Sequence, residues 1–182
     1  MSTTISYENE FNSSITEQQA SMLNNFNKII KNNNVLKVKE EYVNGKISDI
    51  VFYRENESID EIFNKYPMLS RIEVANIIEN NGVYIQQVFE AYSKNEGLKL
   101  RTFNVESIST GKSICHGYYN LQTGEIIPEK TEKYMYDVYG DLVCRFIYNN
   151  IGKIEKIREE GGGIFSNEFS MDYYNNVLPL FP

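Results

Sequence analysis

The sequence Tyr136-Asp-Val-Tyr-Gly140-Asp-Leu142 is followed, twelve residues after its first tyrosine, by Tyr148-Asn-Asn-Ile-Gly152-Lys-Ile154. In each copy a tyrosine precedes a short turn, a glycine, a charged residue and an aliphatic residue. Glycine supplies the positive φ that a tight turn needs, and Asn or Asp tolerates it. Each copy therefore predicts the tip of a β-hairpin. Related sequences occur at residues 42–47 and 119–126.

The residues around these turns alternate between apolar and polar side chains, which is the period of a β-strand. Most connections are short and carry Gly, Asn or Asp. Short connections favour antiparallel neighbours, because parallel strands need long crossovers. The predicted strands are residues 35–43, 47–53, 83–92, 98–105, 112–120, 131–137, 142–148 and 153–158.

Three capping boxes predict helices in the N-terminal half of the chain. The capping pairs are Thr16 with Gln19, Ser58 with Glu61, and Ser70 with Glu73. Apolar residues at helical spacing follow the first and third boxes: Met22, Leu23, Phe26, Ile29 and Ile30, then Ile72, Val74, Ile77 and Ile78. The predicted fold class is therefore α+β, an antiparallel meander of about six to eight strands with two or three N-terminal-half helices packed on one face.

Length and composition indicate one domain with two distinct ends. A chain of 182 residues, 41% of them hydrophobic, is long enough for one domain with a core of its own. Residues 1–15 are polar and predict a flexible arm. Residues 16–160 form the predicted α+β domain. The triplet Gly161-Gly-Gly163 predicts a hinge, and the aromatic residues up to Pro182 form a tail beyond it.

Charge and cysteine content exclude several classes of protein. The net charge is −7 and the Lys and Arg residues are scattered, so we expect no nucleic-acid partner. An acidic chain favours a basic protein partner. Two cysteines are too few for a disulfide framework. The N-terminus does not resemble a signal peptide, and no apolar run has the length of a membrane span. These features predict a cytoplasmic protein.

Three short sequences suggest chemistry but lack the pattern that it requires. Cys115 and His116 are neighbours in a predicted strand and point to opposite faces, so they cannot pair, although His116 could pair with an acid brought close by the fold. With Cys144 they cannot complete an ordinary zinc site without carboxylates. Thr110-Gly-Lys-Ser113 lacks the earlier glycine of a phosphate-binding loop and precedes a strand, so it predicts a turn. We expect no catalytic residue, cofactor or metal.

The densest acidic run, residues 55–61, has two interpretations. Carboxylates at the start of a helix are favoured by the helix dipole. The same run could instead be an acidic patch that binds a basic toxin. The candidate contact residues are Glu55, Glu57, Asp60, Glu61, Glu40 and Glu41, and Glu129, Glu132, Glu159 and Glu160 could extend the patch.

The paired turns Tyr136-Asp137-x-x-Gly140-x-Leu142 and Tyr148-Asn149-x-x-Gly152-x-Ile154 resemble the YD-repeat family. The first hairpin, Glu41-Tyr-Val-Asn-Gly-Lys, is similar to the MORN-type hairpins of some bacterial antitoxins. The resemblance implies a hairpin scaffold from a toxin–antitoxin locus and no catalytic residue.

With the small size and acidity of the chain, this resemblance predicts a non-catalytic immunity or antitoxin protein that occludes a cognate basic toxin. Two alternatives stay open. One is a ligand-binding or enzymatic domain with a tyrosine-lined pocket on the sheet, and the other is an accessory structural domain of a secretion locus.

Overall fold

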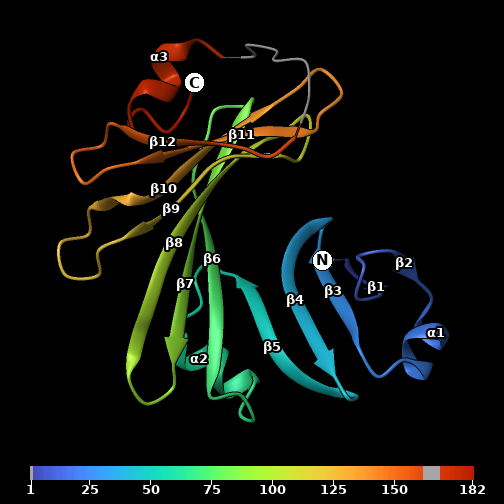
Figure 1. Ribbon diagram of the computed structural model, residues 1–182. Helices are drawn as coiled ribbons and strands as arrows, with labels where there is room; N and C mark the ends of the chain where they lie inside the picture. Colours follow the sequence, from blue (N-terminus) through green and yellow to red (C-terminus); the bar gives the residue numbers. More distant parts are fainter. Residues whose placement is uncertain (1, 162–168) are drawn as a thin grey trace. The chain divides into compact units, whose positions relative to one another are not determined.

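A computed structural model describes residues 2–161 and 169–182 of the chain. In these residues β-strands dominate, and the helices are short (Figure 1). The strands are β1 (Thr3–Glu8), β2 (Ser14–Ile15), β3 (Phe26–Asn32), β4 (Val35–Val43), β5 (Lys46–Tyr53), β6 (Arg71–Asn80), β7 (Tyr84–Ser93), β8 (Gly97–Ser107), β9 (Ser113–Tyr119), β10 (Ile126–Tyr136), β11 (Leu142–Tyr148) and β12 (Ile154–Glu159). The helices are α1 (Glu17–Met22), α2 (Ile59–Lys65) and α3 (Met171–Asn175). None of the described helices is long and apolar enough to cross a membrane.

The predicted α+β class is wrong, because the described chain is mainly one mixed β-sheet. Its hydrogen-bonded strand order is β12-β11-β10-β9-β8-β7-β6-β5-β4-β3-β1-β2. The pairs among β1 to β5 and among β8 to β12 are antiparallel. Strands β5 and β6 are parallel, with Val51 opposite Glu73, and α2 lies in the connection between them. The sheet is therefore not a simple meander.

Two of the predicted helical segments are strands. Helix α1 has the predicted capping box at Thr16, but it ends at Met22, and Phe26–Asn32 forms β3. The box predicted at Ser70 is absent, and Arg71–Asn80 forms β6. Both segments carry β-branched side chains, which fit a pleated sheet better than a helix. The capping box at Ser58 is confirmed and starts α2.

Contacts divide the chain into two compact units. Unit 1 comprises Met1–Asn76 and Phe89–Lys99, and unit 2 comprises Ile77–Val88 and Leu100–Pro182. Strands β6, β7 and β8 contribute residues to both. The N-terminal residues expected as a flexible arm include β1, which pairs along its whole length with β3. Gly162 and Gly163 of the expected hinge lie outside the described residues, and the predicted domain boundaries stay a prediction.

In unit 1, α2 packs on one face of β4, β5 and the start of β6. The core on this face comprises Val38, Ile50, Phe52, Ile62, Phe63, Tyr66, Leu69, Ile72 and Val74. The tight turn between β4 and β5 is the predicted one. Asn44 and Gly45 both have positive φ, at 52° and 69°, as a two-residue hairpin loop requires.

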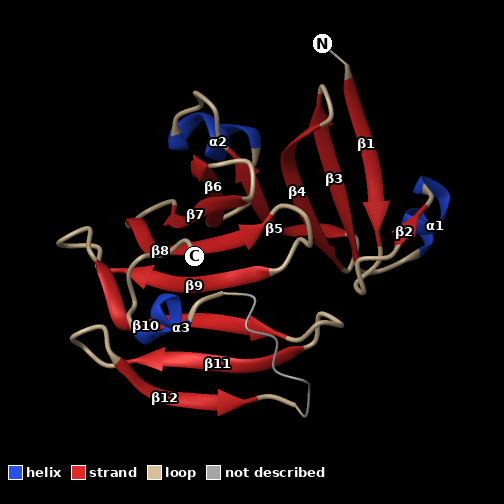
Figure 2. Cartoon of the chain, turned by 90° about the horizontal axis from the view of Figure 1, so that it is seen from above, coloured by secondary structure: helices blue, strands red, loops and turns tan. Residues whose placement is uncertain are grey.

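In unit 2, α3 and the residues around it cover one face of the sheet (Figures 1 and 2). The strands supply alternate residues to this covered face: Phe103, Val105, Cys115, Lys133, Met135, Phe146 and Tyr148. Phe169, Tyr173, Tyr174 and Val177 pack against them. The rings of Phe146 and Tyr174 stack with centroids 4.4 Å apart. The described part of the aromatic tail thus docks on the chain's own sheet.

Candidate functional site

The other face of the unit 2 sheet carries half-buried polar and aromatic side chains. Neighbouring strands place Asn104, His116, Glu132 and Ile147 opposite one another in one row. The α3 segment covers the reverse side of the same strands. Because alternate residues of a strand point to opposite faces, the sequence of each strand supplies both an apolar core and this polar surface.

We use the name open face for the pocket-lining residues of this surface. They surround a pocket of about 540 Å³ and are His116, Tyr118, Glu129, Lys130, Glu132, Tyr134, Arg145 and Ile147. They come from strands β9, β10 and β11 and the bulge within β10. Backbone ladders on both sides hold these strands, so the side chains project from a fixed frame.

Arg145 is the centre of the open face. Its guanidinium lies 3.6 Å from a carboxylate oxygen of Glu132 and 2.9 Å from one of Glu160. The hydroxyl of Tyr134 donates to Glu132 at 3.3 Å, and the guanidinium carbon lies 5.8 Å from the centroid of the Tyr134 ring. This network joins four side chains and places one guanidinium between two carboxylates.

A second group of contacts lies around Tyr118. The His116 ring meets the Tyr118 ring edge-on, with centroids 5.4 Å apart, and the Lys130 ammonium lies 5.8 Å from the Tyr118 centroid. On the open face each of the two tyrosine rings thus has a cation near it, as in surfaces that bind by stacking and cation–π contact.

The expectation that His116 could pair with an acid stays a prediction, with Glu132 as the neighbouring acid. Glu132 lies directly opposite His116 across the β9–β10 ladder. Burial lowers the pKa of His116, and the charge of Glu132 opposes that shift. Burial, with a further contribution from Glu132, raises the pKa of Tyr134. Glu132 is shared by Arg145 and Tyr134, an arrangement that orients side chains for binding.

The adjacent cysteine takes no part in this site. Cys115 is fully buried in the core on the covered face, as the alternation of the strand predicts. Burial raises the pKa of the Cys115 thiol to about 12, although the nearby Lys133 opposes it. The thiol is thus protonated at neutral pH. Among the described residues, no three His, Cys, Asp or Glu side chains are grouped so that they could hold a metal ion.

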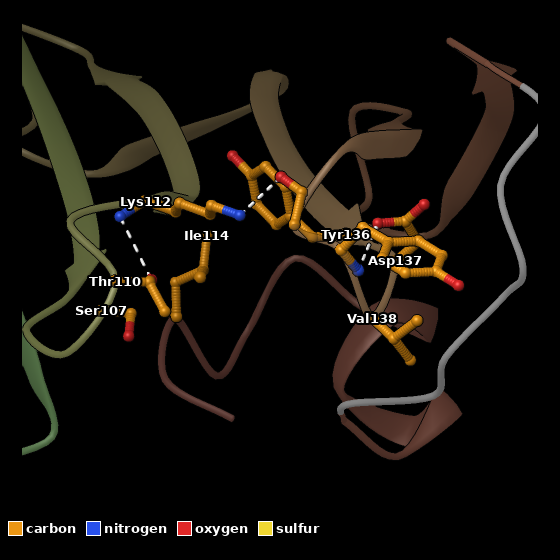
Figure 3. A pocket seen from close by; sticks show the side chains of 9 residues that line it. Ser107, Thr110, Lys112, Ile114, Tyr136, Asp137 and Val138 are labelled. Carbon is orange, nitrogen blue, oxygen red and sulfur yellow. Dashed lines mark hydrogen bonds between the residues drawn. The ribbon is translucent and has the colours of Figure 1, made fainter.

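A second pocket, of about 380 Å³, lies between the β8–β9 and β10–β11 turns (Figure 3). The Lys112 ammonium donates to the carbonyl of Gly140 at 2.5 Å and lies 5.0 Å from the Tyr136 ring centroid. Asp137 accepts hydrogen bonds from the backbone amides of Tyr139 and Asp141. Lys112 therefore links the two turns, and Asp137 stabilises the β10–β11 turn. The sequence around Lys112 is a hairpin turn, as predicted, and not a phosphate-binding loop.

The predicted acidic patch is partly used inside unit 1. Lys37 lies 2.8 Å from Glu57 and 3.7 Å from Glu55. Glu57 also accepts from the backbone amides of Glu55 and Asn56, and Glu61 forms the capping box with Ser58. Asp60 lies in the first turn of α2 and is exposed.

The two remaining predicted contact residues point to opposite faces of β4. Glu40 is 5% exposed and accepts hydrogen bonds from the hydroxyls of Tyr66 and Tyr42, with Lys28 3.4 Å away. Glu41 is exposed and lines a small pocket on the other face. Of the two, only Glu41 is placed where a partner could reach it.

The open face brings together residues that the sequence named separately or not at all. Glu132 and His116 were singled out, but Tyr118, Tyr134 and Arg145 were missed. Within a strand, residues two apart such as His116 and Tyr118, or Glu132 and Tyr134, are predicted to share a face. Their alignment across strands depends on the irregular register between Ile127 and Glu132, which no sequence pattern revealed.

Comparisons of the chain with protein-family models, curated proteins and solved structures found no match. The resemblance to YD-repeat and MORN-type hairpins is therefore a prediction that rests on the quoted turns alone.

Proposed function

We propose that this chain is a non-catalytic binding protein of the bacterial immunity or antitoxin type, and that its open face contacts the toxin. One observation carries the proposal: tyrosine, histidine and arginine side chains line a pocket on the sheet face opposite the one that the α3 segment covers. Tyr and Arg are enriched among the residues that dominate binding energies at protein interfaces. Side chains that are already ordered lose less conformational entropy on binding.

The toxin is a basic protein in this proposal, because the chain is acidic overall. Glu55, Asp60 and Glu41 supply accessible negative charge on unit 1 that supports its approach. Such charges act mainly on the association rate, and the open face supplies the short-range contacts.

The proposal is tested by co-expression in a heterologous bacterial host. Each gene that flanks the source gene is expressed alone and then with this chain. We expect one flanking product to arrest growth and this chain to restore it. The double variant Tyr134→Ala with Arg145→Ala should fail to protect. Lys153→Ala should protect fully, because Lys153 lies in the β11–β12 turn and contacts Asn176 in the segment that covers the other face. Protection by both variants, or no growth arrest by any flanking product, would contradict the proposal.

A small-molecule ligand is the second candidate function, and the size of the pocket favours it. About 540 Å³ lies within the range of roughly 300–1,000 Å³ that is typical of ligand sites, and Tyr118 and Tyr134 line it. A thermal-shift screen of polar metabolites tests this. A ligand whose stabilisation disappears in Tyr118→Ala would support it, and no stabilising ligand would argue for the protein partner. The accessory-domain alternative stays a prediction without a structural observation in its favour.

A further inference from the structure

Lys133 in β10 is fully buried on the covered face of unit 2, where it meets the C-terminal segment. Its ammonium donates to three backbone carbonyls, those of Tyr173 at 2.5 Å, Asn176 at 2.9 Å and Pro179 at 2.6 Å. An ammonium has three N–H donors, so all of them are satisfied. One side chain thus holds three separate points of the segment.

The ammonium of Lys133 lies beside two tyrosine rings. Its nitrogen lies 3.8 Å from the centroid of the Tyr173 ring and 6.0 Å from that of Tyr148. Cys115 lies directly opposite Lys133 on β9. The three carbonyls lie in and just beyond the end of α3, where helix carbonyls have no partner within the helix. Burial lowers the pKa of Lys133 to about 8, an effect that Cys115 opposes, so the ammonium is mainly charged at pH 7.

We call residues 169–182 the strap. Besides its apolar packing, each of the strap's other described polar contacts with unit 2 is a single hydrogen bond, such as that of the Tyr173 hydroxyl to the Ile114 carbonyl at 3.5 Å. The Tyr148 hydroxyl donates to the Tyr174 carbonyl at 2.8 Å, and the Val177 amide donates to the Gly152 carbonyl at 2.8 Å. Lys153 donates to the side-chain oxygen of Asn176 at the exposed rim. Lys133 is therefore the principal polar attachment among the described residues.

We propose that the strap is a conformational device that closes one face of the unit 2 sheet, and that the Lys133 ammonium is its latch. Without the ammonium, one buried and two partly buried hydrogen bonds to carbonyls lose their donor, which is more costly than losing a solvent-exposed contact. Opening of the strap returns these carbonyls to water, while strands β9 to β11 keep their own ladders. The opened face then exposes Phe103, Phe146 and Tyr148, an apolar surface separate from the open face.

Hydrogen exchange of the full chain at pH 7 tests the latch. In Lys133→Met, the amide of Val177 should exchange roughly tenfold faster or more than in the wild type. The amide of Phe146, which belongs to the strand ladder, should keep most of its protection. Lys153→Met is the matched control, because it removes a lysine contact to the same segment at an exposed position. We expect it to change the exchange of Val177 little.

Chemical rescue separates the charge from the packing of the side chain. Lys133→Ala leaves space beside the three carbonyls, so added methylammonium should restore slow exchange at Val177. The same salt should not restore it in Lys133→Met, whose side chain fills the space. If Val177 exchanges fast in Lys133→Ala and methylammonium does not slow it, the effect comes from lost packing, and the proposed role of the ammonium is contradicted.

The wild-type protein supplies a check that needs no variant. With low concentrations of denaturant, strap amides should exchange through an opening of smaller free energy than the amides of β10 and β11. Equal opening free energies for strap and strands in the wild type would overturn the proposal. It would also be overturned if strap and strands lost protection equally in Lys133→Met, or if the strap of that variant stayed as protected as in the wild type.

Discussion

Glu57 is a residue whose ionisation we expect to be visible in the stability of the chain. Burial by itself raises its pKa, but the hydrogen bonds from Lys37 and from the amides of Glu55 and Asn56 lower it to about 2. The folded-state value lies below the usual 4.5. The ionised carboxylate therefore stabilises the fold above about pH 4.5, and this contribution is lost as the pH falls towards 2.

The variant Glu57→Gln should lower the free energy of unfolding by about 1 kcal/mol at pH 7. The gap to the wild type should close between about pH 4.5 and 2, as urea titrations at a series of pH values would show. Glu55→Gln is the control, because the Glu55 side chain is 67% exposed and lies farther from Lys37. A gap that stays constant down to pH 2 would refute the assignment.

Glu40 links β4 to the end of α2 through the Tyr66 hydroxyl, 2.9 Å away. Tyr66→Phe leaves a buried carboxylate oxygen without this donor, so it should destabilise the fold by about 1–2 kcal/mol. Tyr42→Phe removes a similar bond of 3.1 Å in a more exposed setting and should cost less. Chemical denaturation of both variants measures the difference. A larger loss for Tyr42→Phe would contradict the role of Glu40 in holding α2.

The hairpin strands were the part of the fold that the sequence predicted well. Strands β4 and β11 have the predicted bounds, because alternating side chains flank turns that need glycine. Strands β3 and β6 were mistaken for helices. Apolar residues three and four apart, such as Phe26, Ile29 and Ile30, fit the apolar stripe of a helix. Their β-branched or aromatic side chains also fit a β-sheet, and pairing with strands distant in the sequence decides for the sheet.

The β11–β12 turn should be less tolerant of substitution than the β4–β5 turn. Gly45 and Gly152 both have positive φ, which strains any other residue. A Cβ at Gly45 would meet nothing within 4 Å, whereas one at Gly152 would lie 2.8 Å from a methyl group of Val177. Gly45→Ala should cost about 1 kcal/mol and Gly152→Ala clearly more. Thermal melts compare them, and equal shifts would contradict the packing of Val177 on this turn.

The sequence predicted neither the division into two units nor the open face. Strands β6, β7 and β8 belong to both units, so no linker or change in composition marks a boundary. The open face depends on which residues of β9, β10 and β11 are opposed. Register in this region includes an irregularity in β10, and the sequence on either side fits more than one alignment.

The proposed approach of a basic toxin predicts a salt-dependent association rate. Reversal of Glu55 and Asp60 to Lys should slow association at low ionic strength, and the difference should shrink as salt is added. Glu57 and Glu61 are left unchanged, because they hold internal hydrogen bonds and their reversal would disturb α2. Stopped-flow or surface-binding kinetics with the captured toxin measure this. A rate indifferent to salt and to both reversals would contradict the electrostatic part of the proposal.

Site-specific photo-crosslinking is the measurement that most directly tests the open face as the binding surface. A photoreactive residue is placed at Tyr134 or Tyr118, on the open face, and in separate proteins at Asp60 or Val43, on unit 1. The account predicts that the two open-face positions crosslink to the toxin captured by co-expression and that the Val43 control does not. Crosslinks from Asp60 or Val43, with none from Tyr118 or Tyr134, would contradict it.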